Sequence, residues 1–208
     1  MTGVCAIPGL NLAVTPDQVP APEPDLSMDF VSGVAVLAGG CFWCTEAVFR
    51  QLSGVKGVQP GYAGGRSENA NYRDVCTGLS GHAEAIRIHY DPTRISFGRL
   101  LQVFFAVAHD ATQKDRQGND IGSQYRSAIF PQDAGQERMA VNYIRQLRQS
   151  GVFLGDIATT VEPGQVFHPA EAYHHDYAAR HPEQAYVLAV SKPKIDKLRE
   201  YFRDYLVK

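Results

Sequence analysis

Two cysteines flank a pair of aromatic residues directly after a predicted strand. Residues 33–38 form a short apolar run that predicts a buried strand, and residues 39–44 continue as Gly-Gly-Cys-Phe-Trp-Cys. Two glycines permit a tight turn, so Cys41 is expected in the first turn of a following helix. Free backbone N–H groups and the helix dipole there stabilise negative charge. Since the thiolate is the nucleophilic form of cysteine, the pattern predicts a reactive thiol of lowered pKa at Cys41.

The second cysteine of this pair, Cys44, is expected on the same helical face as Cys41, close enough for a disulfide. The alternative is that both are small buried core residues that do no chemistry. For a lone cysteine the core interpretation would be the better one. The succession of strand, glycines, cysteine, aromatics and cysteine favours chemistry instead.

A carboxylic acid is predicted to face apolar surroundings at the start of another strand. Residues 84–90 alternate, with Glu84, Ile86, Ile88 and Tyr90 on one face. Loss of water around a carboxylate disfavours its charged form and raises its pKa. A carboxyl that stays protonated at neutral pH can donate a proton to an oxygen atom. A glutamate turned back to water at the strand end is the alternative.

A polar run at residues 116–127 supplies further hydrogen-bonding groups, including Asp120 and Tyr125. Runs of this kind are more often surface loops than functional sites. Tyr72, in the sequence Asn-Tyr-Arg-Asp at 71–74, is a weaker candidate still.

Strands and helices alternate along the chain in a way that predicts an α+β fold, with helices packed on a sheet. Besides the strands above, we expect strands at 126–130 and 157–161, and mostly loop with a brief strand at 57–80. The expected helices cover 44–52, 96–107, 133–151, 170–179 and 194–206. Local pattern does not fix the strand order.

Four prolines at residues 15–25 divide the chain into an arm, 1–31, and a single catalytic domain, 32–208. We expect the arm to lie over the domain or to extend free of it.

Charge and hydropathy exclude several classes of protein. There are 20 Lys and Arg against 22 Asp and Glu, a net charge of −2, so no basic excess favours nucleic acid or an anionic membrane. No apolar run approaches the roughly 20 residues of a membrane span, and the first ten residues do not resemble a signal peptide. Four cysteines are too few for a disulfide scaffold. We expect a monomeric cytoplasmic protein.

Five motifs then resemble one family in order and spacing. They are Gly-Cys-Phe-Trp at 40–43, Gly-Tyr-Ala-Gly-Gly at 61–65, Tyr-Arg-Asp-Val-Cys at 72–76, Gly-His-Ala-Glu at 81–84, and Arg-Gln-Gly-Asn-Asp at 116–120 continuing to Gln-Tyr-Arg-Ser at 124–127. From about residue 33 onward the chain is similar to the A-type peptide methionine sulfoxide reductases. The resemblance implies a two-layer sandwich related to the ferredoxin-like plait, with a mixed sheet.

The resemblance also implies reduction of the S-epimer of methionine sulfoxide, in proteins and as the free amino acid, without a cofactor. Cys41 would attack the sulfoxide sulfur and become a sulfenic acid. Glu84 would protonate the oxygen, helped by the hydroxyls of Tyr72 and Tyr125. Asp120 would help to hold the site through hydrogen bonds, and the methyl group would lie against Phe42 and Trp43.

Regeneration of Cys41 departs from the commonest family pattern, because no cysteine follows Cys76 and the C-terminal end reads as a charged helix. Cys44, at a position that many relatives fill with glycine, is our first choice as resolving thiol. Cys5 is the second choice and Cys76 the third. Thioredoxin would reduce the resulting disulfide, or would attack the sulfenic acid directly if no internal thiol resolves it.

Two other functions compete. The Cys41–Cys44 spacing fits a general thiol–disulfide oxidoreductase, although the surrounding sequence lacks the thioredoxin pattern and leaves Glu84 without a role. A metal-binding module could use these cysteines with His174 and His175, but the histidines read more simply as part of a helix. Stereospecific action on methionine sulfoxide and metal analysis of the reduced protein separate these alternatives.

Overall fold

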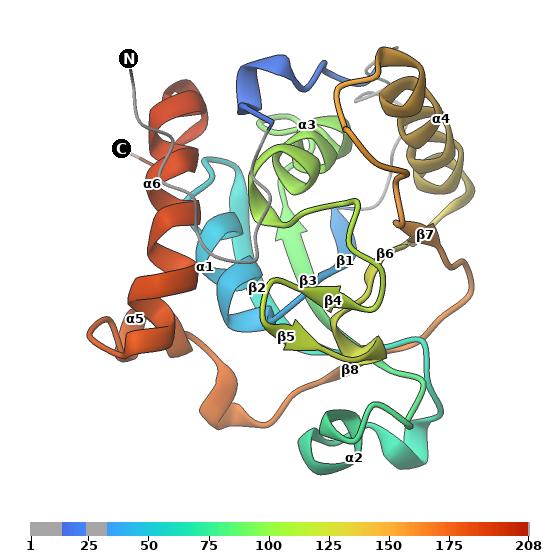
Figure 1. Cartoon of the computed structure of the whole chain (residues 1–208), viewed down its shortest axis with the longest axis vertical. Helices are drawn as coiled ribbons and strands as arrows, with labels where there is room; N and C mark the ends of the chain where they lie inside the picture. Colours follow the sequence, from blue (N-terminus) through green and yellow to red (C-terminus); the bar gives the residue numbers. More distant parts are fainter. Residues whose placement is uncertain (1–13, 24–32, 208) are drawn as a thin grey trace.

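The structure is a computed structural model that describes residues 14–23 and 33–207 (Figure 1). Its main sheet has six strands in the order β7-β6-β1-β3-β2-β8, with β6 and β7 parallel and all other neighbours antiparallel. The strands are β1 (Val34–Gly39), β2 (Val55–Ala63), β3 (Ala83–Tyr90), β6 (Ser127–Phe130), β7 (Thr160–Val161) and β8 (Phe167–Pro169); β4 (Arg116–Gln117) and β5 (Asp120–Ile121) form a separate hairpin. The predicted α+β class with a mixed sheet is confirmed.

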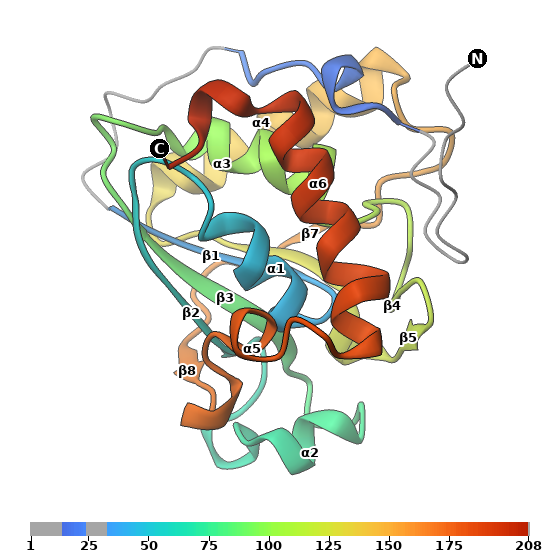
Figure 2. The ribbon, with the colours of Figure 1, turned by 90° about the vertical axis from the view of Figure 1, so that its left-hand side faces the viewer.

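The helices gather mainly on one side of this sheet (Figures 1 and 2). They are α1 (Phe42–Phe49), α2 (Tyr72–Cys76), α3 (Phe97–Val103), α4 (Ala134–Ser150), α5 (Tyr177–Arg180) and α6 (Lys192–Tyr201). Single π-helical turns follow α3 (Phe104–Ala108) and precede α6 (Val187–Ser191), and short 3-10 turns lie at Pro16–Gln18, Ser67–Asn69, Ser123–Tyr125, Ala172–His174 and Arg203–Tyr205. None of the helices described is both long enough and apolar enough to cross a membrane.

Alternation along the strands divides the core between the two faces of the sheet. Large side chains such as Leu37, Ile86 and Ile88 join the helices in the main core. The opposite face holds a smaller cluster made mostly of alanines, closed by Phe130 and Phe167. Because β3 alternates, Glu84 falls on the face of Ile86 and points toward the main core, as predicted.

The long helix α4 shows how local signals fix an element. Asp133 precedes it and accepts the N–H of Gln136 at 2.8 Å, while Gly151 ends it in the left-handed conformation at φ 65°. Both ends were predicted from these residues. The expected helix at 96–107 is also present, with Ser96 accepting the N–H of Arg99, but its second half is the π-helical turn.

The prediction for residues 57–80 was wrong, because β2 is the longest strand of the sheet. Pro60 and Gly61 hide it in the sequence, since both are normally depleted from strands. A Cβ at position 61 would lie 2.3 Å from the His168 carbonyl oxygen, so glycine lets β8 approach. The strand expected at 157–161 shortens to β7, because the Ala158 N–H pairs with the Ala111 carbonyl instead.

The described part of the proline-rich segment lies over the domain. Val19 is fully buried, and its carbonyl accepts the Gln102 side chain of α3 at 2.8 Å. The Pro20 carbonyl accepts the Tyr143 hydroxyl of α4 at 2.7 Å. Residues 14–23 therefore cover the core between α3 and α4. The remainder of the predicted arm, including Cys5, lies outside the described residues.

Candidate active site

Strand β3 brings a buried carboxyl to the beginning of α1. The Phe42 N–H donates to Glu84 Oε2 at 3.0 Å, and only 2% of Glu84 is exposed. Burial raises the pKa of Glu84 to about 8; the Phe42 N–H opposes the rise, and the nearby charges of Asp120 and Cys44 add to it. The protonated carboxyl that the sequence predicted is therefore present at neutral pH.

Cys41 lies one residue before α1 rather than inside its first turn. Its carbonyl accepts the N–H groups of Cys44 and Thr45, which is the role of an N-cap residue. The N–H of the next residue, Phe42, is taken by Glu84 and not by the Cys41 sulfur. Glu84 and Cys41 nevertheless line one pocket of about 80 Å³, together with Phe42, Trp43, Tyr72, Asp120, Tyr125 and Tyr186.

The two thiols of the pair hydrogen-bond to each other, and their pKa values separate. Burial raises the pKa of Cys41, and the neighbouring Cys44 and Glu84 add to this. The pKa of Cys44 falls to about 6, first through the hydrogen bond from Cys41 and against the cost of burial, with Lys194, Ser191 and Tyr186 also lowering it. The expectation that Cys41 itself has a lowered pKa was therefore wrong. The two thiols titrate as a pair, and their surroundings favour the negative charge on Cys44 over Cys41.

Phe42 and Trp43 form an apolar wall whose orientation is fixed by two neighbours. Trp43 stacks on Tyr177 with ring centroids 3.7 Å apart and planes at 10°. Its Nε1–H donates to His174 Nδ1 at 3.1 Å. The His174 ring also packs against Phe42 at 4.9 Å.

Two tyrosines with hydroxyl donors, Tyr72 and Tyr125, line the same pocket. Burial raises the pKa values of Tyr72 and Tyr125, and the charge of Glu84 adds to both. These hydroxyls keep their protons at any physiological pH, so they can donate to a bound oxygen atom. Tyr72 comes from α2 and Tyr125 from the turn after β5, and the two motifs that were weak in the sequence meet here.

Asp120, on β5, is held by a residue that sequence reasoning missed. The Tyr186 hydroxyl donates to Asp120 Oδ2 at 2.6 Å, and the Tyr186 ring stands edge-on to Trp43. The Cys44 sulfur lies 3.8 Å from the same hydroxyl, in hydrogen-bonding contact. Tyr186 lies far along the chain from every motif, so no local signal indicated it.

The segment around residues 171–177 supports the pocket from outside. Glu171 accepts the Tyr72 N–H at 2.9 Å and the Tyr62 hydroxyl at 2.7 Å. His174 is 1% exposed and bonds to Trp43 rather than joining the two cysteines. Within 14–23 and 33–207, no three His, Cys, Asp or Glu side chains gather to hold a metal ion.

Cys76, the third candidate for a resolving thiol, is exposed at the end of α2 and hydrogen-bonds to Tyr72. Burial raises its pKa, so it is less reactive at neutral pH than Cys44.

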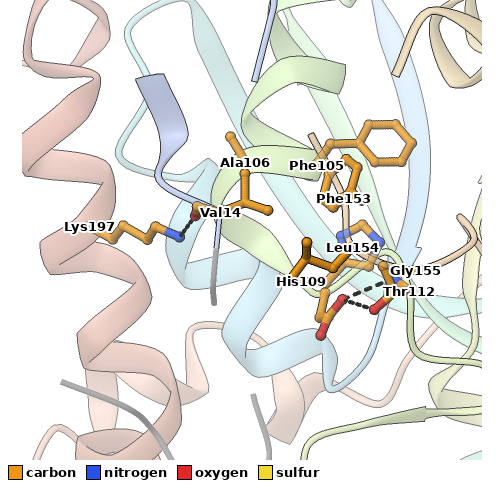
Figure 3. Close-up of a pocket in the computed structure, with 10 residues that line it drawn as sticks. Val14, Phe105, Ala106, His109, Thr112, Phe153, Leu154, Gly155 and Lys197 are labelled. Atoms are coloured by element: carbon orange, nitrogen blue, oxygen red, sulfur yellow. Dashed lines mark hydrogen bonds between the residues drawn. The ribbon is translucent and has the colours of Figure 1, made fainter. Parts of the chain in front are cut away.

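A second pocket, of about 240 Å³, is lined mainly by residues 105–112, which include part of the π-helical turn after α3, and by residues 153–155 after α4, with Val14 and Lys197 of α6 at one side (Figure 3). Its polar groups are occupied by the fold: Lys197 Nζ donates to the Val14 carbonyl at 3.0 Å, and Asp110 Oδ1 accepts the Thr112 hydroxyl at 2.7 Å. Burial lowers the pKa of His109, beside them, to about 4. This pocket therefore offers a neutral imidazole and no nucleophile.

Comparison with known proteins yields one family. A sequence model described as "Peptide methionine sulfoxide reductase" matches residues 33–206. The peptide methionine sulfoxide reductase MsrA of Picrophilus torridus is 51% identical over 169 residues, which are 81% of this chain and 94% of that protein. The protein of the same name from Deinococcus radiodurans is 51% identical over 172 residues, 83% of each chain.

Solved structures agree. The crystal structure of Mxr1 from Saccharomyces cerevisiae in reduced form superimposes with a TM-score of 0.66 at 30% identity, over 76% of this chain and 90% of that one. Methionine sulfoxide reductase A of Corynebacterium diphtheriae gives a TM-score of 0.64 at 31% identity, over 88% and 89%.

Proposed function

The chain belongs to the peptide methionine sulfoxide reductase family, and from this premise we propose which residues carry each step of the reduction. The enzyme reduces methionine sulfoxide; we assign it the S-epimer, in proteins and as the free amino acid. The contact between the Phe42 N–H and Glu84 carries the assignment, because it holds a protonated carboxyl in the pocket that Cys41 borders.

Cys41 attacks the sulfoxide sulfur while Glu84 gives its proton to the oxygen. A sulfoxide sulfur is electrophilic only when its oxygen is protonated or strongly hydrogen-bonded, so acid and nucleophile must converge. Tyr72 and Tyr125 donate to the same oxygen. Cys41 releases its proton to the hydrogen-bonded Cys44 thiolate as it attacks. The oxygen and its proton move to Cys41, which becomes a sulfenic acid, and methionine leaves.

The aromatic wall selects the substrate. The S-methyl group lies against Phe42 and Trp43, whose ring is held by Tyr177 and His174. Asp120 positions the hydroxyl of Tyr186 at the pocket edge. A methyl-sized apolar site beside three proton donors fits a methyl sulfoxide.

Cys44 then resolves the sulfenic acid. It is the nearest thiol, already bonded to Cys41, and because its pKa is about 6 the proton that it accepted from Cys41 passes on to solvent at neutral pH. The product is a Cys41–Cys44 disulfide. We assign its reduction to thioredoxin, in the cytoplasm that the composition predicts.

The test uses the reduced enzyme and one equivalent of methionine-S-sulfoxide, followed by mass spectrometry of the quenched protein. We expect a Cys41–Cys44 link, and a lasting Cys41 sulfenic acid, trapped by dimedone, in the Cys44→Ser variant. Cys76→Ser is the matched control and should close the disulfide normally. A link from Cys41 to Cys5 or Cys76 would overturn the assignment of Cys44.

The role of Cys41 has its own test. Cys41→Ser should yield no methionine while circular dichroism shows the native fold. Turnover retained by this variant would place the nucleophile at another residue.

A further inference from the structure

Cys44 is enclosed by side chains that come from the C-terminal segment. It is 1% exposed, and the fully buried Ser191 hydroxyl donates to its sulfur at 3.1 Å. Ser191 ends the π-helical turn and Lys194 follows in the first turn of α6, three residues on, which places both on one helical face. Figure 2 shows α6 running beside α1, which carries Cys44.

Lys194 is a buried cation without a carboxylate partner in the described chain. It is 2% exposed, and its Nζ donates to the Ala108 carbonyl at 2.7 Å. Every ion pair found among residues 14–23 and 33–207 involves other side chains. Burying an ammonium group is unfavourable unless an anion offsets its charge. The charge of Lys194 acts on Cys44 in the direction that favours the thiolate.

We propose that Ser191 and Lys194 hold Cys44 as a thiolate, Lys194 as its counter-ion and Ser191 as its hydrogen-bond donor. Both are positioning residues for the regeneration step, and the proposal rests on the resolving role assigned to Cys44 above. The chain has no cysteine after Cys76, so its C-terminal residues do not provide the resolving thiol. Through Ser191 and Lys194 they provide the hydrogen bond and the positive charge that act on that thiol.

The proposed disulfide forms when Cys44 attacks the sulfenic acid on Cys41. The Cys44 thiolate donates an electron pair to the Cys41 sulfur, the S–O bond of the sulfenic acid breaks, and the oxygen takes one proton from solvent and leaves as water. One S–S bond forms, and no external oxidant or reductant is consumed. A site that favours the Cys44 thiolate returns the proton accepted from Cys41 to solvent, which an ordinary thiol, with a pKa near 8.5, would do only to a small extent at neutral pH.

The test isolates Cys44 by replacing the other three cysteines with serine, at positions 5, 41 and 76. Thiolate absorbance at 240 nm is then followed against pH. The titratable groups facing Cys44 besides the replaced Cys41 are Glu84 from β3 and Tyr186 and Lys194 from the C-terminal segment. We expect Lys194→Met to move the midpoint upward by about one pH unit or more relative to the same triple-serine protein, a roughly ten-fold loss of acidity.

Ser191→Ala is a second, smaller variant that keeps the test valid if Lys194→Met destabilises the fold; it should move the midpoint in the same direction. Lys192→Met is the matched control, since Lys192 lies on the same helix but pairs with Asp196 at the surface. A midpoint that neither Lys194→Met nor Ser191→Ala moves overturns the proposal.

A kinetic readout in the otherwise native enzyme completes the test. Sulfenic acid on Cys41 should persist about ten-fold longer at pH 5 in Lys194→Met, because a rise of one unit in the Cys44 pKa from about 6 lowers the ionised fraction about ten-fold there, and only about two-fold at pH 7. The two proposals fail separately. If the absorbance titration behaves as expected but Cys41 is found bonded to another cysteine, the resolving role is wrong while the thiolate site stands.

Discussion

The Tyr186 hydroxyl donates a 2.6 Å hydrogen bond to Asp120, which joins the C-terminal segment to the β4–β5 hairpin at the edge of the pocket. No sequence motif links these two residues, which lie 66 positions apart. The bond fixes the carboxylate whose charge also acts on Glu84.

Tyr186→Phe should therefore lower kcat/KM about ten-fold, the cost of one hydrogen bond to a charged group. The ring is kept, so packing against Trp43 persists. Steady-state kinetics with methionine-S-sulfoxide measure the change. Tyr201→Phe, which changes a partly exposed tyrosine on α6, is the control. Equal activity of both variants would show that the bond does not contribute.

Glu84→Gln should remove the alkaline limb of the pH–rate profile. In the native enzyme the protonated carboxyl is the active form, so the rate of methionine formation should fall as pH rises through about 8. The amide cannot donate an acidic proton, and the variant should be slow, by about a hundred-fold or more, without this dependence.

Glu46→Gln is the control for that profile. Glu46, on α1, is also buried, and burial raises its pKa to about 7, but it accepts the Asp176 N–H and does not line the pocket with Cys41. Its replacement should leave the fall near pH 8 in place. If Glu84→Gln keeps that fall instead, another group is the acid.

His174→Phe tests how Trp43 is held. His174 Nδ1 accepts the indole N–H, so the imidazole is neutral, and burial lowers its pKa and keeps it so. Without the acceptor, we expect a shifted emission maximum from Trp43, the only tryptophan, and a KM raised about five-fold with a smaller change in kcat. His175→Phe should change neither quantity. Unaltered emission in His174→Phe would contradict the positioning role.

Asp133→Ala tests a structural prediction made from sequence. Loss of the bond to the Gln136 N–H should lower the free energy of unfolding by about 1 kcal/mol. Urea denaturation measures this loss. Asp133→Asn retains a capping oxygen and should recover most of it; failure of asparagine to do so would indicate that charge, not the cap, stabilises α4.

Prediction from the sequence was right where a short stretch of the chain determines the local structure. The ends of α4 follow from Asp133 and Gly151, and the inward direction of Glu84 follows from strand alternation. It was wrong about β2, because Pro60 and Gly61 disfavour a strand when the sequence is read locally. In the fold, Gly61 leaves the space that β8 needs in order to pair with β2. That requirement comes from residues about a hundred positions away.

The residues of the candidate site also fall into two groups, those that sequence motifs indicated and those that only the fold brings together. The motifs indicated eight of its residues, and seven of these line the pocket with Tyr186, while the eighth, Cys44, lies behind Cys41. Tyr186, His174, Ser191 and Lys194 act through tertiary contacts alone. The error about the Cys41 pKa has the same origin, since burial and the facing Cys44 outweigh the helix terminus.

Cys44 is buried beside a partly exposed Cys41, so the proposed disulfide between them would be reached from the Cys41 side. A reductant would then attack the Cys41 sulfur, along the path by which a methionine side chain enters. The protein to be repaired must depart before the reductant can bind, so the two must alternate. Initial rates measured at several concentrations of each should give parallel double-reciprocal lines, the kinetic pattern of a ping-pong enzyme.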